Sequence, residues 1–156
     1  EWGVRTILNP APATKELKVS DISSLSFLVP NESELELLSG MPTTTEEEIV
    51  AAARSLIAQG IGTVIVTLGG RGARLVTADD VKVIEAVKVK PVDTTGAGDA
   101  FIGSFAHFLA ATGDVEQSLN RAARYAAFSV GRRGTQKSYA TAAEFEEFCK
   151  SLSASE

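Results

Sequence analysis

A run of small residues that ends in a carboxylate is the part of this sequence best suited to chemistry. The run is Thr94-Thr95-Gly96-Ala97-Gly98-Asp99, and a segment with helical periodicity follows it. Glycine leaves backbone N–H groups uncovered, and a helix N-terminus directs more of them to the same place, which favours an anion such as phosphate. Asp99 could then remove a proton from an alcohol while the N–H groups of residues 96–99 hold a phosphoryl group. The structural alternative is a tight strand-to-helix turn in which Asp99 only complements the helix dipole.

Two other motifs have a structural interpretation from their residues alone. Asn31 and Glu34 have the spacing of a capping box at the start of a helix. The run Thr67-Leu68-Gly69-Gly70-Arg71-Gly72 lacks the Gly-Lys-Ser/Thr of a Walker A loop. A strand is predicted after it, whereas a dinucleotide-binding fingerprint requires a helix there. This glycine run is therefore predicted to be a tight hairpin.

The elements that position these motifs alternate along the chain. β-branched runs predict strands, and periodic apolar residues predict helices, so we expect an α/β fold with a mostly parallel sheet and flanking helices. The predicted strands are Val4–Leu8, Ser26–Val29, Thr63–Leu68, Ala73–Thr77 and Val81–Val89. In the last of these, the valines share one parity and the lysines the other, which is typical of a half-exposed strand.

Four helices are predicted to pack on this sheet. The first starts at one of three overlapping capping boxes, formed by Thr43, Thr44 or Thr45 with a glutamate three residues later, and it ends at Gly60. The others are residues 99–112, with Phe101, Phe105, Phe108 and Leu109 on one face; residues 115–131, with a stripe of small residues; and residues 141–152, with a Thr141/Glu144 box and buried Phe145 and Phe148. We expect residues 153–156 to fray.

Composition limits the class of protein. The chain has 156 residues, 44% hydrophobic and 22% charged, with a net charge of −5. This composition is typical of one soluble globular domain. The net negative charge indicates neither nucleic acid nor a membrane surface as a partner. No apolar run reaches the ~18 residues of a membrane span. The single cysteine, Cys149, fits a reducing compartment, and we expect a cytoplasmic protein. The chain lacks an initiator Met, and Glu1-Trp2-Gly3 is typical of the end of a helix, so we expect part of a longer protein.

The run Val92–Phe101 resembles the second signature of the ribokinase-like (PfkB) carbohydrate kinase family. Further matches follow in the family's order and cover nearly the whole chain: residues 8–13 (Leu-Asn-Pro-Ala-Pro-Ala), 30–34 (Pro-Asn-Glu-Ser-Glu), 67–72, and 134–139 (Gly-Thr-Gln-Lys-Ser-Tyr). The resemblance implies the Rossmann-like ribokinase fold. It also implies that residues 1–152 are its C-terminal, ATP-binding and catalytic part, without the lid through which such kinases form homodimers and without the first sugar-binding segment.

The resemblance implies an activity as well: phosphorylation of a sugar primary hydroxyl by ATP, with Asp99 as general base and an anion hole at Gly96, Ala97, Gly98 and Asp99. The Asn-Pro-Ala-Pro-Ala and Gly-Thr-Gln-x-Ser runs favour D-ribose, which would give D-ribose 5-phosphate. Phosphorylation of fructose, ketodeoxygluconate or a nucleoside is an alternative, and so is a nucleotide-binding fragment without turnover. We expect the isolated chain to be inactive.

The remaining site residues are assigned from the same resemblance. The nucleotide contacts would be Asn31, Thr67, Gly69, Gly70, Gly72, Gly98, Asp99 and Ala123. Glu34 would act on Mg²⁺ through metal-bound water, which suits the reluctance of Mg²⁺ to lose its hydration. A monovalent cation, K⁺, would be held by Asp93, Thr95, Ser129, Arg132, Gly134 and Ser138, because one carboxylate with several carbonyl and hydroxyl oxygens suits a hard cation of low charge. The alternative for this last group is a capped helix end with Gly134 as its C-terminal glycine.

Overall fold

The computed structural model describes residues 3–153, which form two compact units: the first extends to Val83 and the second begins at Ile84. The expected helix end at Glu1 and Trp2 therefore lies outside the described residues, as do residues 154–156 of the expected tail. Within residues 3–153, no helix has the length and apolar character needed to cross a membrane.

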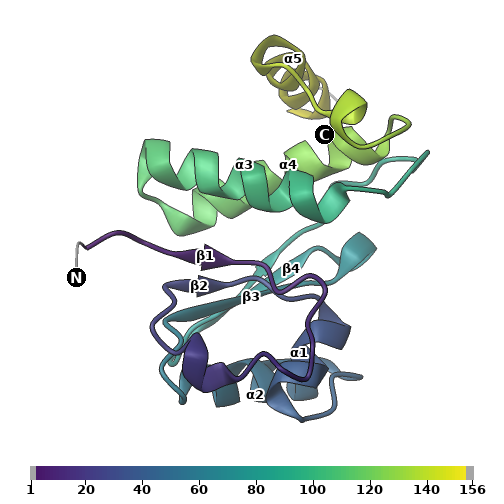
Figure 1. Ribbon diagram of the computed structural model, residues 1–156. Coiled ribbons are helices and arrows are strands. Elements are labelled where there is room, and N and C mark those ends of the chain that lie inside the picture. Colours follow the sequence, from purple (N-terminus) through teal and green to yellow (C-terminus); the bar gives the residue numbers. More distant parts are fainter. Residues whose placement is uncertain (1–2, 154–156) are drawn as a thin grey trace. The chain divides into compact units, whose positions relative to one another are not determined.

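The first unit is built on a five-stranded sheet whose strands lie in sequence order (Figure 1). They are β1 (Ile7–Leu8), β2 (Phe27–Leu28), β3 (Thr63–Thr67), β4 (Ala73–Val76) and β5 (Val81–Ile84). The first three strands are parallel, with Leu28 opposite both Leu8 and Val64, and β4 runs antiparallel to β3. The predicted α/β fold with a mostly parallel sheet is confirmed.

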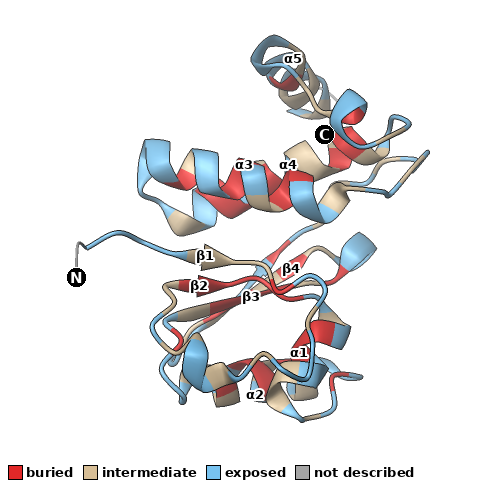
Figure 2. Cartoon of the chain, in the orientation of Figure 1, coloured by how far each residue is buried: buried red, intermediate tan, exposed pale blue. Residues whose placement is uncertain are grey.

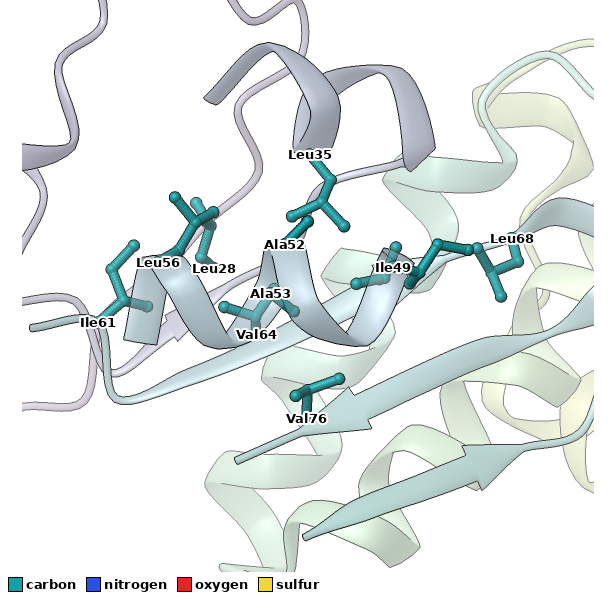
Figure 3. Close-up of a cluster of buried hydrophobic side chains, with 11 residues drawn as sticks. Leu28, Leu35, Ile49, Ala52, Ala53, Leu56, Ile61, Val64, Leu68 and Val76 are labelled. Atoms are coloured by element: carbon teal, nitrogen blue, oxygen red, sulfur yellow. The ribbon is translucent and has the colours of Figure 1, made fainter. Parts of the chain in front are cut away.

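Two helices, α1 (Glu32–Ser39) and α2 (Glu46–Ile57), cover one face of this sheet (Figure 1). Their inner faces and the central strands are buried (Figure 2). Ile49, Ala53 and Leu56 of α2 pack with Val64 of β3 and Val76 of β4 in one apolar cluster (Figure 3). Burial of this apolar surface, at about 25 cal/mol per Å², is the main term that holds α2 on the sheet.

The second unit consists of helices: α3 (Ala97–Thr112), α4 (Val115–Val130) and α5 (Ala142–Ser153). The first two lie side by side and are joined by a short turn at Gly113, whose φ of 74° favours glycine (Figure 1). Aromatic pairs connect α4 and α5: the Tyr125 and Phe145 rings are 5.2 Å apart, and the Phe128 and Phe148 rings 5.5 Å apart. Three short 3₁₀ helices complete the chain, η1 (Val19–Asp21), η2 (Gly69–Arg71) and η3 (Gln136–Ser138).

Several predicted boundaries are wrong. The strand predicted over Val81–Val89 ends at Ile84, and its inward residue is Ile84 (1% exposed) rather than Val83 (52% exposed). Valine therefore occupies an exposed position here, because its β-branched side chain favours extended backbone even without burial. The other strands are each shorter than predicted, β1 starting at Ile7 instead of Val4.

Helix boundaries also shift. The helix predicted from Asp99 begins at Ala97, because Gly96 adopts φ 79° and serves as the N-cap. The last helix runs one residue beyond Leu152, through Ser153. On α3, Phe101, Phe105 and Leu109 are buried as predicted, whereas Phe108 is only half-buried.

Candidate active site

The glycine-rich turn leads directly into α3 and leaves backbone donors at its N-terminus. The Ala97 N–H is used within the turn, 3.2 Å from the Thr94 carbonyl oxygen, and the Ala100 N–H donates to Gly96 at 2.9 Å. The N–H groups of Gly98 and Asp99 have no acceptor within residues 3–153. Two free donors at the positive end of a helix dipole form a site for an anion.

Asp93 holds the backbone just before this turn. One carboxylate oxygen accepts from the Thr95 N–H at 3.0 Å, and the other accepts from the Gly134 N–H at 2.9 Å. The hydrogen bond from Gly134, followed by those from the hydroxyl and N–H of Thr95, lowers the pKa of Asp93 to about 2. The carboxylate is therefore charged at neutral pH. Val92 and Asp93 also donate through their N–H groups to the Val130 carbonyl, at 2.7 and 3.1 Å.

The turn after α4 also packs against Gly96. A Cβ on Gly96 would lie 3.2 Å from Cγ2 of Thr135 and 3.4 Å from the hydroxyl oxygen of Tyr139. Together with the positive φ, this contact means that no larger side chain fits at Gly96 without a shift. The structure thus brings Asp93, Thr95, Gly96 and Gly134 together. Asp93, Thr95 and Gly134 are three of the residues that were predicted to surround a cation.

The other predicted cation ligands have side chains engaged elsewhere. The Ser129 hydroxyl donates to the Ala126 carbonyl (2.8 Å) and the Ser138 hydroxyl to the Thr135 carbonyl (2.6 Å). The Arg132 guanidinium pairs with Glu144 at 3.0 Å and lies 4.3 Å from the Phe128 ring centroid. Arg132 can therefore offer only its carbonyl oxygen to a cation, whereas each serine hydroxyl keeps its oxygen lone pairs while it donates its hydrogen.

Two further observations concern this turn. The glycine that caps α4 is Gly131, so the alternative with Gly134 as the C-terminal glycine is wrong; Gly134 instead has φ 88° and donates to Asp93. Across the described part of the chain, no three His, Cys, Asp or Glu side chains cluster in a way that could hold a metal ion.

A cavity of about 410 Å³ adjoins Asp99 within the second unit. Asp99, Ser104, Arg121, Tyr125, Tyr139 and Glu146 are among the residues that line it. Arg121 lies 4.4 Å from the Phe108 ring centroid and its Nη2 is 2.6 Å from Glu146. The Tyr125 hydroxyl donates to the Ala140 carbonyl at 2.8 Å, and burial raises the pKa of Tyr125. No local sequence motif marks this cavity, because its walls come from three helices and from Tyr139 and Ala140, which follow η3.

In the first unit, Asn31 and Glu34 form the predicted capping box. The Glu34 N–H donates to Oδ1 of Asn31, and the Asn31 N–H donates to Oε2 of Glu34, both at 2.9 Å. Glu34 is 8% exposed, and its Oε1 has no hydrogen-bond partner within residues 3–153. The capping interpretation is confirmed, and one carboxylate oxygen is left over.

The glycine run forms the predicted hairpin between β3 and β4. The Leu68 N–H donates to the Gly72 carbonyl at 2.8 Å, and Thr67 is paired with Ala73 across the strands. Gly69 has φ 56°, and a Cβ on Gly69 or Gly70 would meet no atom within 4 Å, so the turn is open on its outer side.

The hairpin and the capping box adjoin each other within the first unit. The Thr67 N–H donates to the Pro30 carbonyl at 2.9 Å, and Thr67 and Asn31 form a parallel β-bridge. The predicted nucleotide contacts Asn31, Thr67, Gly69, Gly70 and Gly72 therefore form one cluster. The three remaining ones belong to the second unit: Gly98 and Asp99 lie in the first turn of α3, and Ala123 is half-buried on α4.

Comparison with known proteins identifies the family. The model of the pfkB family of carbohydrate kinases matches residues 3–142. The chain is 49% identical over 146 residues to a deoxyribokinase of Salmonella typhi, a match that covers 94% of this chain and 48% of the relative. A ribokinase of Staphylococcus aureus is 40% identical over 137 residues, covering 87% and 45%.

A solved structure gives the same result for the fold. Arabidopsis thaliana ribokinase complexed with ribose and ATP has a TM-score of 0.87 at 30% identity, covering 95% of this chain and 48% of that one. The chain thus spans about half the length of the relatives that it matches. By sequence and by fold, it belongs to the pfkB family of carbohydrate kinases.

Proposed function

We propose that this chain carries the ATP-binding and catalytic part of a kinase that phosphorylates D-ribose on its primary hydroxyl, giving D-ribose 5-phosphate. The observation that carries the proposal is the pair of free N–H groups at Gly98 and Asp99, next to a carboxylate that lines a cavity. The relative solved with ribose and ATP supports the choice of both substrates.

Asp99 is the proposed general base. Its carboxylate would accept the proton of the sugar hydroxyl as the oxygen attacks the γ-phosphorus, while the bond from the γ-phosphorus to the bridging oxygen breaks and ADP leaves. The N–H groups of Gly98 and Asp99, with those of Gly96 and Ala97 in the same turn, would bind the phosphoryl oxygens as negative charge gathers on them. Ala97 would first have to release its hydrogen bond to Thr94.

The nucleotide would contact the glycine hairpin, Asn31 and Ala123. Gly69 and Gly70 suit this role because nothing packs on their outer side, so that ribose or phosphate can approach the backbone. Glu34 fits a metal-bound water, because its Oε1 is unpartnered while Oε2 is fixed by Asn31. Mg²⁺, when bound, would neutralise phosphate charge.

Asp93 fits a monovalent cation beside the turn. Its low pKa keeps one negative charge there, and the carbonyls of Thr95, Ser129, Arg132, Gly134 and Ser138 are the further oxygens proposed for K⁺. Such a cation would supply positive charge near the anion site.

A second sugar, 2-deoxy-D-ribose, is favoured by one specific observation, the 49% identity to a deoxyribokinase.

Initial rates of phosphorylation by the full-length protein separate the candidate substrates. The substrates to compare are D-ribose, 2-deoxy-D-ribose, D-fructose, ketodeoxygluconate and a nucleoside. Our proposal predicts the highest kcat/KM for D-ribose. A higher value for deoxyribose would move the assignment to that sugar, and a higher value for another substrate would overturn it. We expect residues 1–156 alone to give no sugar-dependent turnover in the same assay.

The Asp99→Asn substitution tests the proposed base. We expect kcat to fall by about 10²–10⁴-fold, because the amide cannot accept the proton. ATP affinity and the free energy of unfolding should stay near those of the wild type. Asp114→Asn is the matched control: it makes the same chemical change at the N-cap of α4, where asparagine caps equally well. A kcat for Asp99→Asn within threefold of the wild type would contradict the mechanism.

A further inference from the structure

Arg71 connects the glycine hairpin to two helix N-termini. It is the last residue of η2, between Gly70 and Gly72, and its Nη2 lies 2.5 Å from Oε1 of Glu32, the first residue of α1. Its Nη1 lies 3.5 Å from Oε1 of Glu46, the first residue of α2. No sequence pattern marks this role of Arg71, because its partners are 39 and 25 residues away.

Arg74 fixes the second of these acids. Its Nε and Nη2 bind the two carboxylate oxygens of Glu46 at 2.9 and 2.8 Å, and its side chain is 13% exposed. Arg71 is different, with a side chain that is 49% exposed. Exposed ion pairs contribute little to folding stability, so the contacts of Arg71 do little to explain how the unit holds together.

The place of Arg71 indicates another role. The hairpin is open around Gly69 and Gly70, and the backbone hydrogen bonds at its tip are internal to the turn: the Arg71 N–H donates to the Leu68 carbonyl and the Gly72 N–H to the Gly69 carbonyl. Glu32 directly follows Asn31 of the capping box. The ion pair of Arg71 with Glu32 therefore joins the tip of one proposed nucleotide-binding segment to the start of the other, beyond the backbone link at Thr67.

We propose that Arg71 is a positioning residue for the nucleotide: it holds the Gly69–Gly72 turn beside Asn31 and Glu34 so that both segments meet ATP in one geometry. This inference rests on the proposed function of the site. Arg71 acts through Glu32 and need not touch the nucleotide.

Steady-state kinetics of the full-length protein test this role. For Arg71→Ala we expect the KM for ATP to rise about threefold to tenfold with kcat within twofold, since a looser turn weakens binding more than the chemical step. Glu32→Gln should raise the KM similarly, and the double variant should be no worse than either single one. Arg71→Lys should lie between, because an ammonium lacks the fork that reaches two acids. Arg54→Ala, an exposed arginine of α2 with no ion pair within residues 3–153, is the control and should change nothing.

The outcomes separate the alternatives. If Arg71 bound phosphate directly, Glu32→Gln would leave the KM unchanged, and this would overturn the proposal. If Arg71 served folding only, the melting temperature of Arg71→Ala would fall while the KM for ATP stayed constant. This result would also overturn the proposal. A wild-type protein that does not bind ATP would instead disprove the proposed function.

Discussion

At the scale of single residues, Asp93 shows how one charge can order the backbone around a site. Each of its carboxylate oxygens accepts one main-chain N–H, from Thr95 two positions later and from Gly134 41 positions later. A carboxylate can accept from both at once, whereas an amide side chain offers only one oxygen. The negative charge is therefore part of what joins the turn before α3 to the turn after α4.

The Asp93→Asn substitution should destabilise the protein in a pH-dependent way. The native pKa of about 2 lies below the ordinary value of 3.8, so the charged form is favoured by folding. The contribution of this charge to the free energy of unfolding is present above about pH 4 and is lost as the pH falls toward 2. We expect the variant to be less stable at pH 7 and to approach the wild type near pH 2, as measured by urea unfolding at each pH.

A deficit of the Asp93→Asn variant that does not change between pH 7 and pH 2 would show that charge is not what holds the two turns.

At the scale of elements, the sequence predicts helix starts well, because capping is a local interaction. Of the three overlapping boxes, the structure uses Thr45 with Glu48, and the boxes at Asn31 and Thr141 also form. The buried stripe of α2 follows directly from periodicity. The glycine hairpin was likewise predictable, since its turn residues lie next to one another in the chain.

Features that depend on distant segments could not be predicted in this way. The strand at Val81 ends early although its valines alternate as far as Val89, because strand length depends on a neighbouring strand to pair with. Phe108 has the spacing of a core residue on α3, yet it lies beside Arg121 of α4 at the cavity wall. The ion pair between Arg71 and Glu32 joins segments whose proximity only the fold creates.

Two glycines of the α3 region should respond oppositely to alanine. Gly96 has φ 79°, and an added Cβ would press on Thr135, so Gly96→Ala should destabilise the protein by about 1–2 kcal/mol. Gly103 lies inside α3 with no atom within 4 Å of an added Cβ, so Gly103→Ala should stabilise it by about 0.5–1 kcal/mol. Urea unfolding of both variants measures this, and equal effects would contradict the assigned start of α3.

At the scale of the whole molecule, each of the two units contains residues that we propose as nucleotide contacts. Asn31, Glu34 and the hairpin belong to the first, whereas the Gly96–Asp99 turn and Ala123 belong to the second. Each unit positions its own residues with its own hydrogen bonds.

Hydrogen exchange with and without ATP and Mg²⁺ tests the proposed contacts in each unit. Because bound ligand suppresses opening, at ATP concentrations about 100 times the Kd we expect exchange to slow by up to ~100-fold in peptides covering residues 67–72 and 96–101. Peptides from the middle of α2, which faces the sheet, should change little and serve as the internal control. Absence of protection in either segment would contradict the nucleotide contacts proposed for that segment.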